Sequence, residues 1–229
     1  IPLLIKLLDA ADNLSVQVHP NDSYQRLKPG EMGKTEAWYI VEADPGCGIY
    51  LGLTEDVTRN ELEDAVLAGA DISQFLNFVD VNPGEIYYIP AGTIHAIGKG
   101  VTLIEPQQTS ETTYRFWDWN RRYDSEGKQS PQGKPRQLHV ADSFAVTNFS
   151  GLRGRDFVNH IKGNPRLLFE DQGNTVHQLL KTEHFVVEKI HLTDHQPLIM
   201  HKADLFQAFL VVAGQLTLKT PAGFSAELR

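Results

Sequence analysis

The stretch Gly84-Glu-Ile-Tyr-Tyr-Ile-Pro-Ala-Gly-Thr-Ile-His95 carries glycine, proline and histidine at closely defined spacing. After the first glycine, residues 86–89 are apolar or aromatic and favour a short strand, whose side chains point to opposite faces in turn. Pro90 and Gly92 then predict a tight turn. The spacing Gly-x5-Pro-x-Gly-x2-His therefore predicts a strand, a turn and a second strand that opens with His95.

Short apolar runs rich in β-branched and aromatic residues recur on both sides of this stretch. They include Leu14–Val18, Ala37–Val41, Gly48–Leu53, Glu85–Ile89 and Val101–Glu105. Clusters of Gly, Pro, Asn and Asp separate them, which is typical of an all-β sandwich or barrel. We therefore expect a mostly β fold.

One segment, residues 58–79, interrupts the strand pattern. Thr58-Arg-Asn-Glu61 is a capping box, and apolar residues at helical spacing follow it as far as Gly69, which favours a helix end. Apolar positions at helical spacing also predict a second short helix over Ile72–Val79. Residues 58–79 are thus expected to form a helical insertion between strands.

The polar stretch Arg121–Arg136 contains Gly, Pro and Ser without periodicity, and predicts an exposed loop or linker. Strand patterns return at Phe185–Leu192 and Ala208–Leu218. We therefore expect two domains, one over residues 1–130 and a second β domain over residues 131–229. The last hairpin-like run lacks partner strands, so this second domain is expected to be truncated at its C-terminus.

Composition narrows the function classes. The chain has 229 residues and a formal net charge of −8, without the basic stripe that nucleic-acid binding requires. No run approaches the roughly 20 apolar residues of a membrane-spanning helix. The single cysteine, Cys47, is compatible with a reducing compartment, so a cytoplasmic location is expected. We therefore expect neither nucleic acid nor membrane as a partner; the oligomeric state stays open.

Two further segments carry side chains able to bind a metal ion. Gln17 and His19 share one face of a predicted strand whose other face carries valines. Glu36 lies on a strand face that is otherwise apolar, and burying its carboxylate requires a partner. That partner is either a metal cation or a basic side chain, Lys34 or Arg26.

The spacing around His95 matches the second signature of the cupin β-barrels at every fixed position through the histidine. Lys99 stands where the usual asparagine follows. The first cupin signature has His-x-His and a downstream Glu, and this chain has Gln17, His19 and Glu36 in those places. The resemblance implies double-stranded β-helix (cupin or jelly-roll) barrels, including a cupin-like second domain.

The glutamine in the first signature, together with the stretch Gln107–Arg115, gives a closer resemblance. Over most of residues 1–122 the chain resembles the type I phosphomannose isomerases of the short bacterial kind. That resemblance implies one metal ion per chain, usually Zn²⁺, held by Gln17, His19, Glu36 and His95. Two nitrogens and two oxygens suit Zn²⁺ and also accept Mn²⁺, Fe²⁺ or Co²⁺.

The same resemblance implies further site residues. Arg115 matches the active-site arginine, with a salt bridge to Asp118 or Glu111 as its alternative role. Lys34 lies two residues before Glu36 and so shares the rim of the site. Glu111, where the family usually has Asp, is expected to bind substrate. We expect Lys34 to be the general base, with a metal-bound hydroxide or Glu111 as alternatives.

The reaction implied by the resemblance interconverts mannose 6-phosphate and fructose 6-phosphate by proton transfer between C2 and C1 through an enediol. A sugar phosphate is therefore the expected partner. Its phosphate requires cations or N–H donors, and Lys99, Arg121 and Arg122 are candidates. A metal-dependent cupin dioxygenase and a non-catalytic sugar-binding cupin are the alternative functions.

Overall fold

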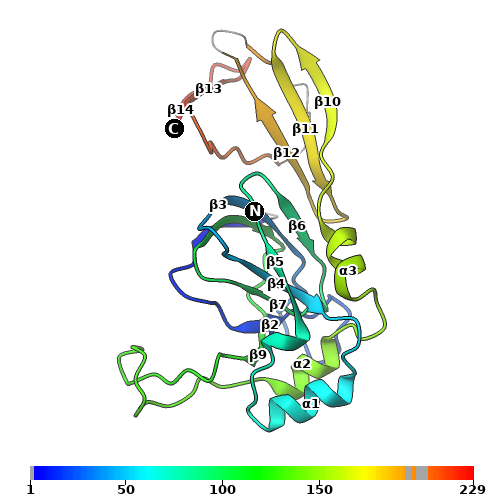
Figure 1. Ribbon diagram of the computed structural model, residues 1–229. Helices are drawn as coiled ribbons and strands as arrows, with labels where there is room; N and C mark the ends of the chain where they lie inside the picture. The colour runs from blue at the N-terminus through cyan, green and yellow to red at the C-terminus, as the bar shows by residue number, and fades with distance from the viewer. Residues whose placement is uncertain (1–2, 194–196, 200–205) are drawn as a thin grey trace. The chain divides into compact units, whose positions relative to one another are not determined.

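The computed structural model describes residues 3–193, 197–199 and 206–229, and Figure 1 shows their secondary structure. The chain divides into two compact units, residues 1–193 and residues 194–229. The second unit contains one antiparallel hairpin, in which β13 (Leu216–Lys219) pairs with β14 (Ser225–Leu228). Every candidate site residue lies in the first unit.

Two antiparallel sheets form the centre of the first unit (Figure 1). The four-stranded sheet has the order β1 (Leu4–Asp9), β8 (Val101–Gln107), β3 (Glu36–Ala43) and β6 (Ile86–Ile89). The five-stranded sheet has the order β5 (Leu76–Asp80), β4 (Gly48–Leu53), β7 (His95–Ile97), β2 (Val16–Val18) and β9 (Tyr114–Trp117).

One hydrophobic cluster joins these two sheets. Its fully buried members include Trp38, Ile40 and Leu103 from the four-stranded sheet and Ile49, Leu51 and Ile97 from the five-stranded sheet. Alternation along each strand sends these side chains to the shared inner face. The predicted mostly β barrel architecture is therefore confirmed.

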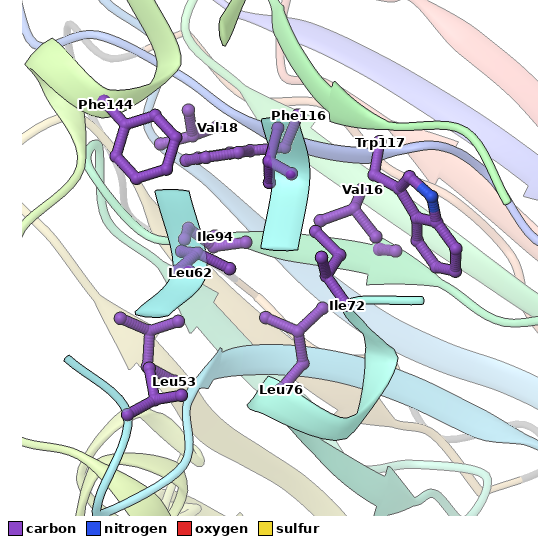
Figure 2. Close-up of a cluster of buried hydrophobic side chains, with 13 residues drawn as sticks. Val16, Val18, Leu53, Leu62, Ile72, Leu76, Ile94, Phe116, Trp117 and Phe144 are labelled. Carbon is purple, nitrogen blue, oxygen red and sulfur yellow. The ribbon is translucent and has the colours of Figure 1, made fainter. Parts of the chain in front are cut away.

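A second hydrophobic cluster covers the outer face of the five-stranded sheet (Figure 2). Val16 and Val18 of β2 face it, and helices α1 (Arg59–Leu67) and α2 (Val140–Val146) pack over it with Leu62 and Phe144. The predicted capping box at the start of α1 is confirmed, since Thr58 Oγ1 accepts a hydrogen bond from the backbone N–H three residues later.

The helix predicted over Ile72–Val79 is wrong. Residues Ser73–Phe75 form a single 3₁₀ turn, and Leu76–Asp80 forms the edge strand β5, paired with β4. Eight residues are too few to keep a helix without tertiary support, whereas the edge of β4 offers unpaired backbone groups. Asn77 adds two side-chain hydrogen bonds to carbonyls of β4. The predicted helical insertion is therefore limited to α1 and this 3₁₀ turn.

Beyond residue 130, two helices pack on the sheets already described. α2 contacts β9 and β2, and α3 (Gly154–Ile161) contacts β4, β5 and β6. A three-stranded antiparallel sheet follows, in the order β10 (Arg166–Asp171), β11 (Asn174–Lys181) and β12 (Val186–His191). A second cupin-like domain over residues 131–229 stays a prediction. Within the described ranges, none of the helices has the length and apolar character needed to cross a bilayer.

Candidate metal centre

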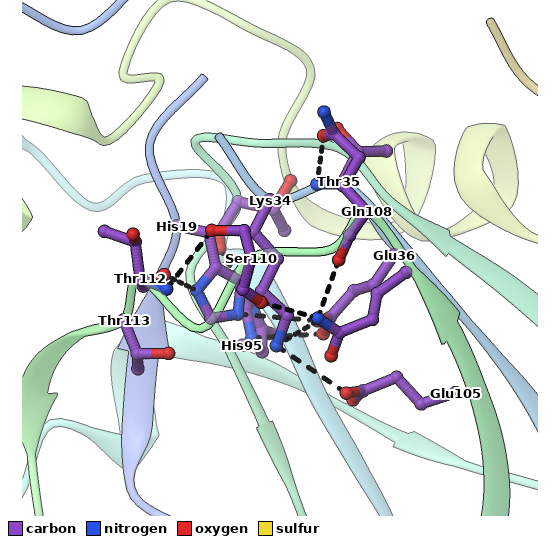
Figure 3. Close-up of polar contacts among 12 residues, drawn as sticks. His19, Lys34, Thr35, Glu36, His95, Glu105, Gln108, Ser110, Thr112 and Thr113 are labelled. Carbon is purple, nitrogen blue, oxygen red and sulfur yellow. Dashed lines mark hydrogen bonds and ion pairs between the residues drawn. The ribbon is translucent and has the colours of Figure 1, made fainter. Parts of the chain in front are cut away.

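Three strand ends bring His19, Glu36 and His95 together between the two sheets (Figure 3). His19 follows β2, while Glu36 and His95 are the first residues of β3 and β7. Each histidine Nε2 lies 3.5 Å from a different oxygen of the Glu36 carboxylate. All three side chains are buried, and their potential ligand atoms lie within 4.8 Å of one another. The structure thus assembles three of the four predicted ligands.

Backbone carbonyls orient both imidazole rings. His19 Nδ1 lies 2.9 Å from the carbonyl oxygen of Thr112, and His95 Nδ1 lies 2.8 Å from that of Thr93. A carbonyl only accepts, so each Nδ1 carries the proton and donates it. The unprotonated Nε2 atoms then face Glu36, which is the arrangement typical of metal-binding histidines.

The atoms that meet at the centre of the triad have no hydrogen-bond partner in the described part of the chain. Both Nε2 atoms and Glu36 Oε1 are buried without a hydrogen bond among the described residues. Two imidazole lone pairs and a carboxylate oxygen repel one another, and a buried polar group without a partner destabilises the fold. A divalent cation among these atoms removes both penalties, so the donor set fits a metal ion.

Electrostatics keeps these groups in the protonation states that a metal ion requires. Burial lowers the pKa of His95 to about 3 and also lowers the pKa of His19. Burial raises the pKa of the Glu36 carboxyl, but the Lys34 ammonium beside it outweighs burial and holds that pKa well below its usual range. At neutral pH the triad therefore offers two neutral imidazoles and one carboxylate.

Lys34 joins this triad to a second buried carboxylate. Its Nζ lies 2.7 Å from Glu36 Oε2 and 3.6 Å from Glu105 Oε1. Burial lowers the pKa of Lys34, but the carboxylates of Glu36 and Glu105 outweigh it and raise that pKa above its ordinary value. Lys34 is therefore a protonated ammonium in this structure. Lys34 and Arg26 were the basic residues considered as partners of Glu36. Lys34 forms this ion pair, whereas Arg26 pairs with Asp142.

Glu105 is a site residue that the sequence reasoning missed. Its Oε2 accepts a 3.0 Å hydrogen bond from the indole N–H of Trp38, and its Oε1 lies 3.4 Å from Lys6 Nζ. Burial and the nearby Glu36 raise the pKa of Glu105. The alternation of side chains along β8 could have revealed it, because Glu105 follows Val101 and Leu103 at every second position on the buried face of that strand.

Strand register places Gln17 and Arg115 beside the triad. Gln17 pairs directly with His95 on one neighbouring strand and with Arg115 on the other. Directly opposed residues of antiparallel strands share a face. Gln17, His95 and Arg115 therefore lie in one row on the inner face of the five-stranded sheet, although β2 carries a bulge next to Gln17.

Arg115 does not form the salt bridge considered as its alternative role. Among the described residues, Asp118 is instead bound by Arg121 and Arg136, at 2.5 Å from each. The Arg115 guanidinium donates one hydrogen bond from Nη1 to the carbonyl of Gln137 over 2.8 Å. Its Nε is buried and has no partner among the described residues.

Comparisons with known proteins agree with this geometry. No family model matches the chain. A mannose-6-phosphate isomerase of Streptococcus mutans is 46% identical over 145 residues, which cover 63% of this chain and 43% of that protein. Mannose-6-phosphate isomerase ManA of Bacillus subtilis is 43% identical over 160 residues, covering 69% of this chain and 48% of that protein. The resemblance to mannose-6-phosphate isomerases is confirmed.

Solved structures give the same family. The crystal structure of mannose 6-phosphate isomerase from Bacillus subtilis superposes with a TM-score of 0.71 at 33% identity, covering 84% of this chain and 56% of that chain. A mannosephosphate isomerase structure from Archaeoglobus fulgidus, 24% identical with a TM-score of 0.53, covers 77% of this chain and 50% of that chain and shows the shared fold. The chain spans about half the length of the mannose-6-phosphate isomerases it matches.

The remaining predicted residues are less closely tied to the triad. Glu111 is exposed and lines a surface pocket of about 300 Å³ together with Met32 and Thr112, whose carbonyl holds His19. Among the candidates for phosphate binding, Arg121 is engaged by Asp118, Arg122 donates to a loop carbonyl, and Lys99 is exposed. The geometry therefore places Glu111, rather than Arg121, beside a space open to a ligand.

Proposed function

We propose that this chain carries the metal-binding part of a mannose-6-phosphate isomerase and interconverts mannose 6-phosphate and fructose 6-phosphate in the cytoplasm. The observation that carries this proposal is the buried triad of His19, Glu36 and His95, whose unprotonated Nε2 atoms have no hydrogen bond to any residue that the structure describes. Proteins bearing this activity in their names match 63% and 69% of this chain.

The metal ion proposed for this triad is Zn²⁺, with Gln17 as the fourth ligand. The register that sets Gln17 opposite His95 supports this assignment, and a set of two imidazoles, one carboxylate and one amide oxygen suits zinc. A distant mannose 6-phosphate isomerase of the same fold, 15% identical, contains zinc and yttrium in its crystal structure. When bound, Zn²⁺ would supply positive charge beside the oxygens of the enediol.

Arg115 is proposed to bind and orient the substrate. It lies in the same row as Gln17 and His95, on the inner face of the sheet. A planar guanidinium recognises two adjacent oxygens well, and O1 and O2 of the open-chain sugar are such a pair. Glu111, at the neighbouring pocket, is proposed to accept hydrogen bonds from sugar hydroxyls.

Lys34 is proposed as the general base that moves the proton between C2 and C1. Lys34 is buried beside Glu36. The negative charge of the Glu36 carboxylate raises the pKa of Lys34 and so keeps it an ammonium. With a dication bound to Glu36, the pKa of Lys34 would fall, because the attraction of the carboxylate would be cancelled and positive charge would lie nearby. The neutral amine would then accept the C2 proton and return it to C1, while the hydroxyl proton of O2 passes to O1.

Metal content, isomerisation and oxygen uptake measured on one preparation test this function. Zn²⁺-loaded chain is expected to bind one ion, to form fructose 6-phosphate from mannose 6-phosphate and to consume no oxygen. Glu36→Gln is expected to abolish both metal binding and turnover, whereas Glu42→Gln, an exposed change on the same strand, retains both. Oxygen uptake without isomerisation would indicate a dioxygenase, and sugar binding without either reaction would indicate a binding protein.

A further inference from the structure

The backbone of Arg115 is held by His139, the residue that precedes α2. The Arg115 N–H donates a 3.1 Å hydrogen bond to His139 Nδ1, and the His139 N–H donates a 2.8 Å hydrogen bond to the Arg115 carbonyl. The Arg115 guanidinium donates a hydrogen bond to the carbonyl of Gln137, two residues before His139 in the sequence. The backbone and the side chain of Arg115 are therefore both hydrogen-bonded to the short segment 137–139.

The direction of the first hydrogen bond defines the protonation state of His139. A backbone N–H only donates, so Nδ1 must present a lone pair, and the proton of the neutral ring is on Nε2. An imidazolium carries protons on both nitrogens and would direct one of them at the Arg115 N–H. Protonation of His139 thus replaces an attraction at this edge of β9 with a repulsion.

We propose that His139 is a positioning residue for Arg115. Neutral His139 holds β9 so that the Arg115 guanidinium lies in the row with Gln17 and His95, and protonated His139 releases this strand. This inference rests on the proposed function, in which Arg115 binds the substrate. His139 itself need not touch the sugar.

The groups around His139 favour its neutral form at pH 7. Burial lowers its pKa, the Arg115 guanidinium lowers it further, and Asp142 on α2 raises it, with a net decrease. Asp142 is itself bound by the Tyr24 hydroxyl and by Arg26, so its negative charge is partly neutralised. The Tyr114 ring, 6.2 Å from the imidazole between centroids, completes the surroundings.

Nuclear magnetic resonance on the full chain tests the contact without reference to activity. We expect the His139 ring to have its proton on Nε2 at pH 7, and its pKa to lie below the ordinary value of 6.5. The Arg115 backbone amide is expected to shift with the same midpoint as His139. An Nδ1-protonated neutral ring, or an Arg115 amide that does not follow His139, would overturn the proposal.

Kinetics on Zn²⁺-loaded variants tests the positioning role. His139→Ala removes the acceptor, and we expect kcat to fall about five- to tenfold, the size of one lost hydrogen bond. His139→Asn keeps an acceptor oxygen that does not titrate, so it should restore kcat and lose the part of the acid decline that follows His139. The exposed His160→Ala on α3 is the matched control and should leave kcat and the pH profile unchanged.

The outcomes separate this inference from the proposed function. Loss of kcat in His139→Ala without rescue by His139→Asn, or an unchanged acid limb in His139→Asn, overturns the positioning role. Wild-type kcat in His139→Ala overturns it as well. If the wild-type chain binds zinc but does not isomerise, the proposed function fails, and the Arg115 amide titration alone decides whether His139 holds this strand.

Discussion

The Lys34 ammonium lies 2.7 Å from Glu36 Oε2 inside the barrel, where the two side chains are 5% and 0% exposed. A fully buried carboxylate is stable only with a partner of opposite charge. Lys34 serves as that partner in the metal-free chain, while the two imidazoles contribute none of the positive charge because burial keeps them neutral. The stability of the metal-free protein therefore depends on a residue proposed to act in catalysis.

Lys34→Met is expected to destabilise the metal-free protein by about 3–5 kcal/mol, because it leaves the Glu36 charge buried and unpaired. Urea unfolding in the presence of a chelator measures this free energy of unfolding. Lys99→Met, at an exposed position, is the control and should change it by less than about 0.5 kcal/mol. Addition of Zn²⁺ should stabilise Lys34→Met more than wild type. Equal stability of both variants without metal would contradict the role of this ion pair.

Zinc binding is expected to raise the thermal stability of the wild-type chain, because a ligand that binds only the folded state stabilises it. At free zinc equal to about 100 times Kd, the gain is about 2.7 kcal/mol. Glu36→Gln should lose this gain, and Glu42→Gln, at an exposed position near the end of β3, should keep it. Calorimetric melting with and without zinc provides the measurement. A zinc-induced shift of the same size in Glu36→Gln would place the metal elsewhere.

Acid should destabilise the metal-free protein well above the pKa of its carboxylates. His95 has a pKa of about 3 in the folded chain and an ordinary value of 6.5, so the unfolded chain binds more protons between these values. Its stabilising contribution is complete above pH 6.5 and is lost as the pH falls towards 3, by up to about 1.4 kcal/mol per pH unit. Urea midpoints at pH 7 and pH 5 measure the loss. His95→Gln should show a smaller decrease between the two pH values than wild type.

Much of the candidate metal centre was predictable because its residues lie in short local patterns. The Gly-x5-Pro-x-Gly-x2-His spacing predicted the strand, the turn and His95, and alternation predicted that Gln17 and its neighbour at residue 19 share a face. Glu36 was predicted from an unfavourable position, a carboxylate on an apolar strand face. In each case a few consecutive residues contained the physical constraint.

The residues that were missed depend on pairing between distant strands. Glu105 joins the site because β8 pairs with β3, which brings it to the Trp38 indole, 67 residues away in sequence. The hydrogen bond between the Arg115 N–H and His139 likewise joins β9 to a segment that follows it only after a long loop. The strand at Leu76–Asp80 was mistaken for a helix because its apolar spacing fits both, and the open edge of β4 decided between them.

Thr58→Ala is expected to destabilise the protein by about 1 kcal/mol, because α1 begins at a complete capping box. Thr58 Oγ1 accepts from the Glu61 N–H, and Glu61 Oε2 accepts from the Thr58 N–H over 2.8 Å. The loss should affect the fold because α1 buries Leu62 and Val66 against the outer face of the five-stranded sheet. Urea unfolding measures it, and Thr58→Ser, which keeps the hydroxyl acceptor, should recover most of the stability. An unchanged metal affinity in Thr58→Ala is also expected, since α1 packs on the face opposite the triad; a large loss of affinity would show that the cap supports the metal centre.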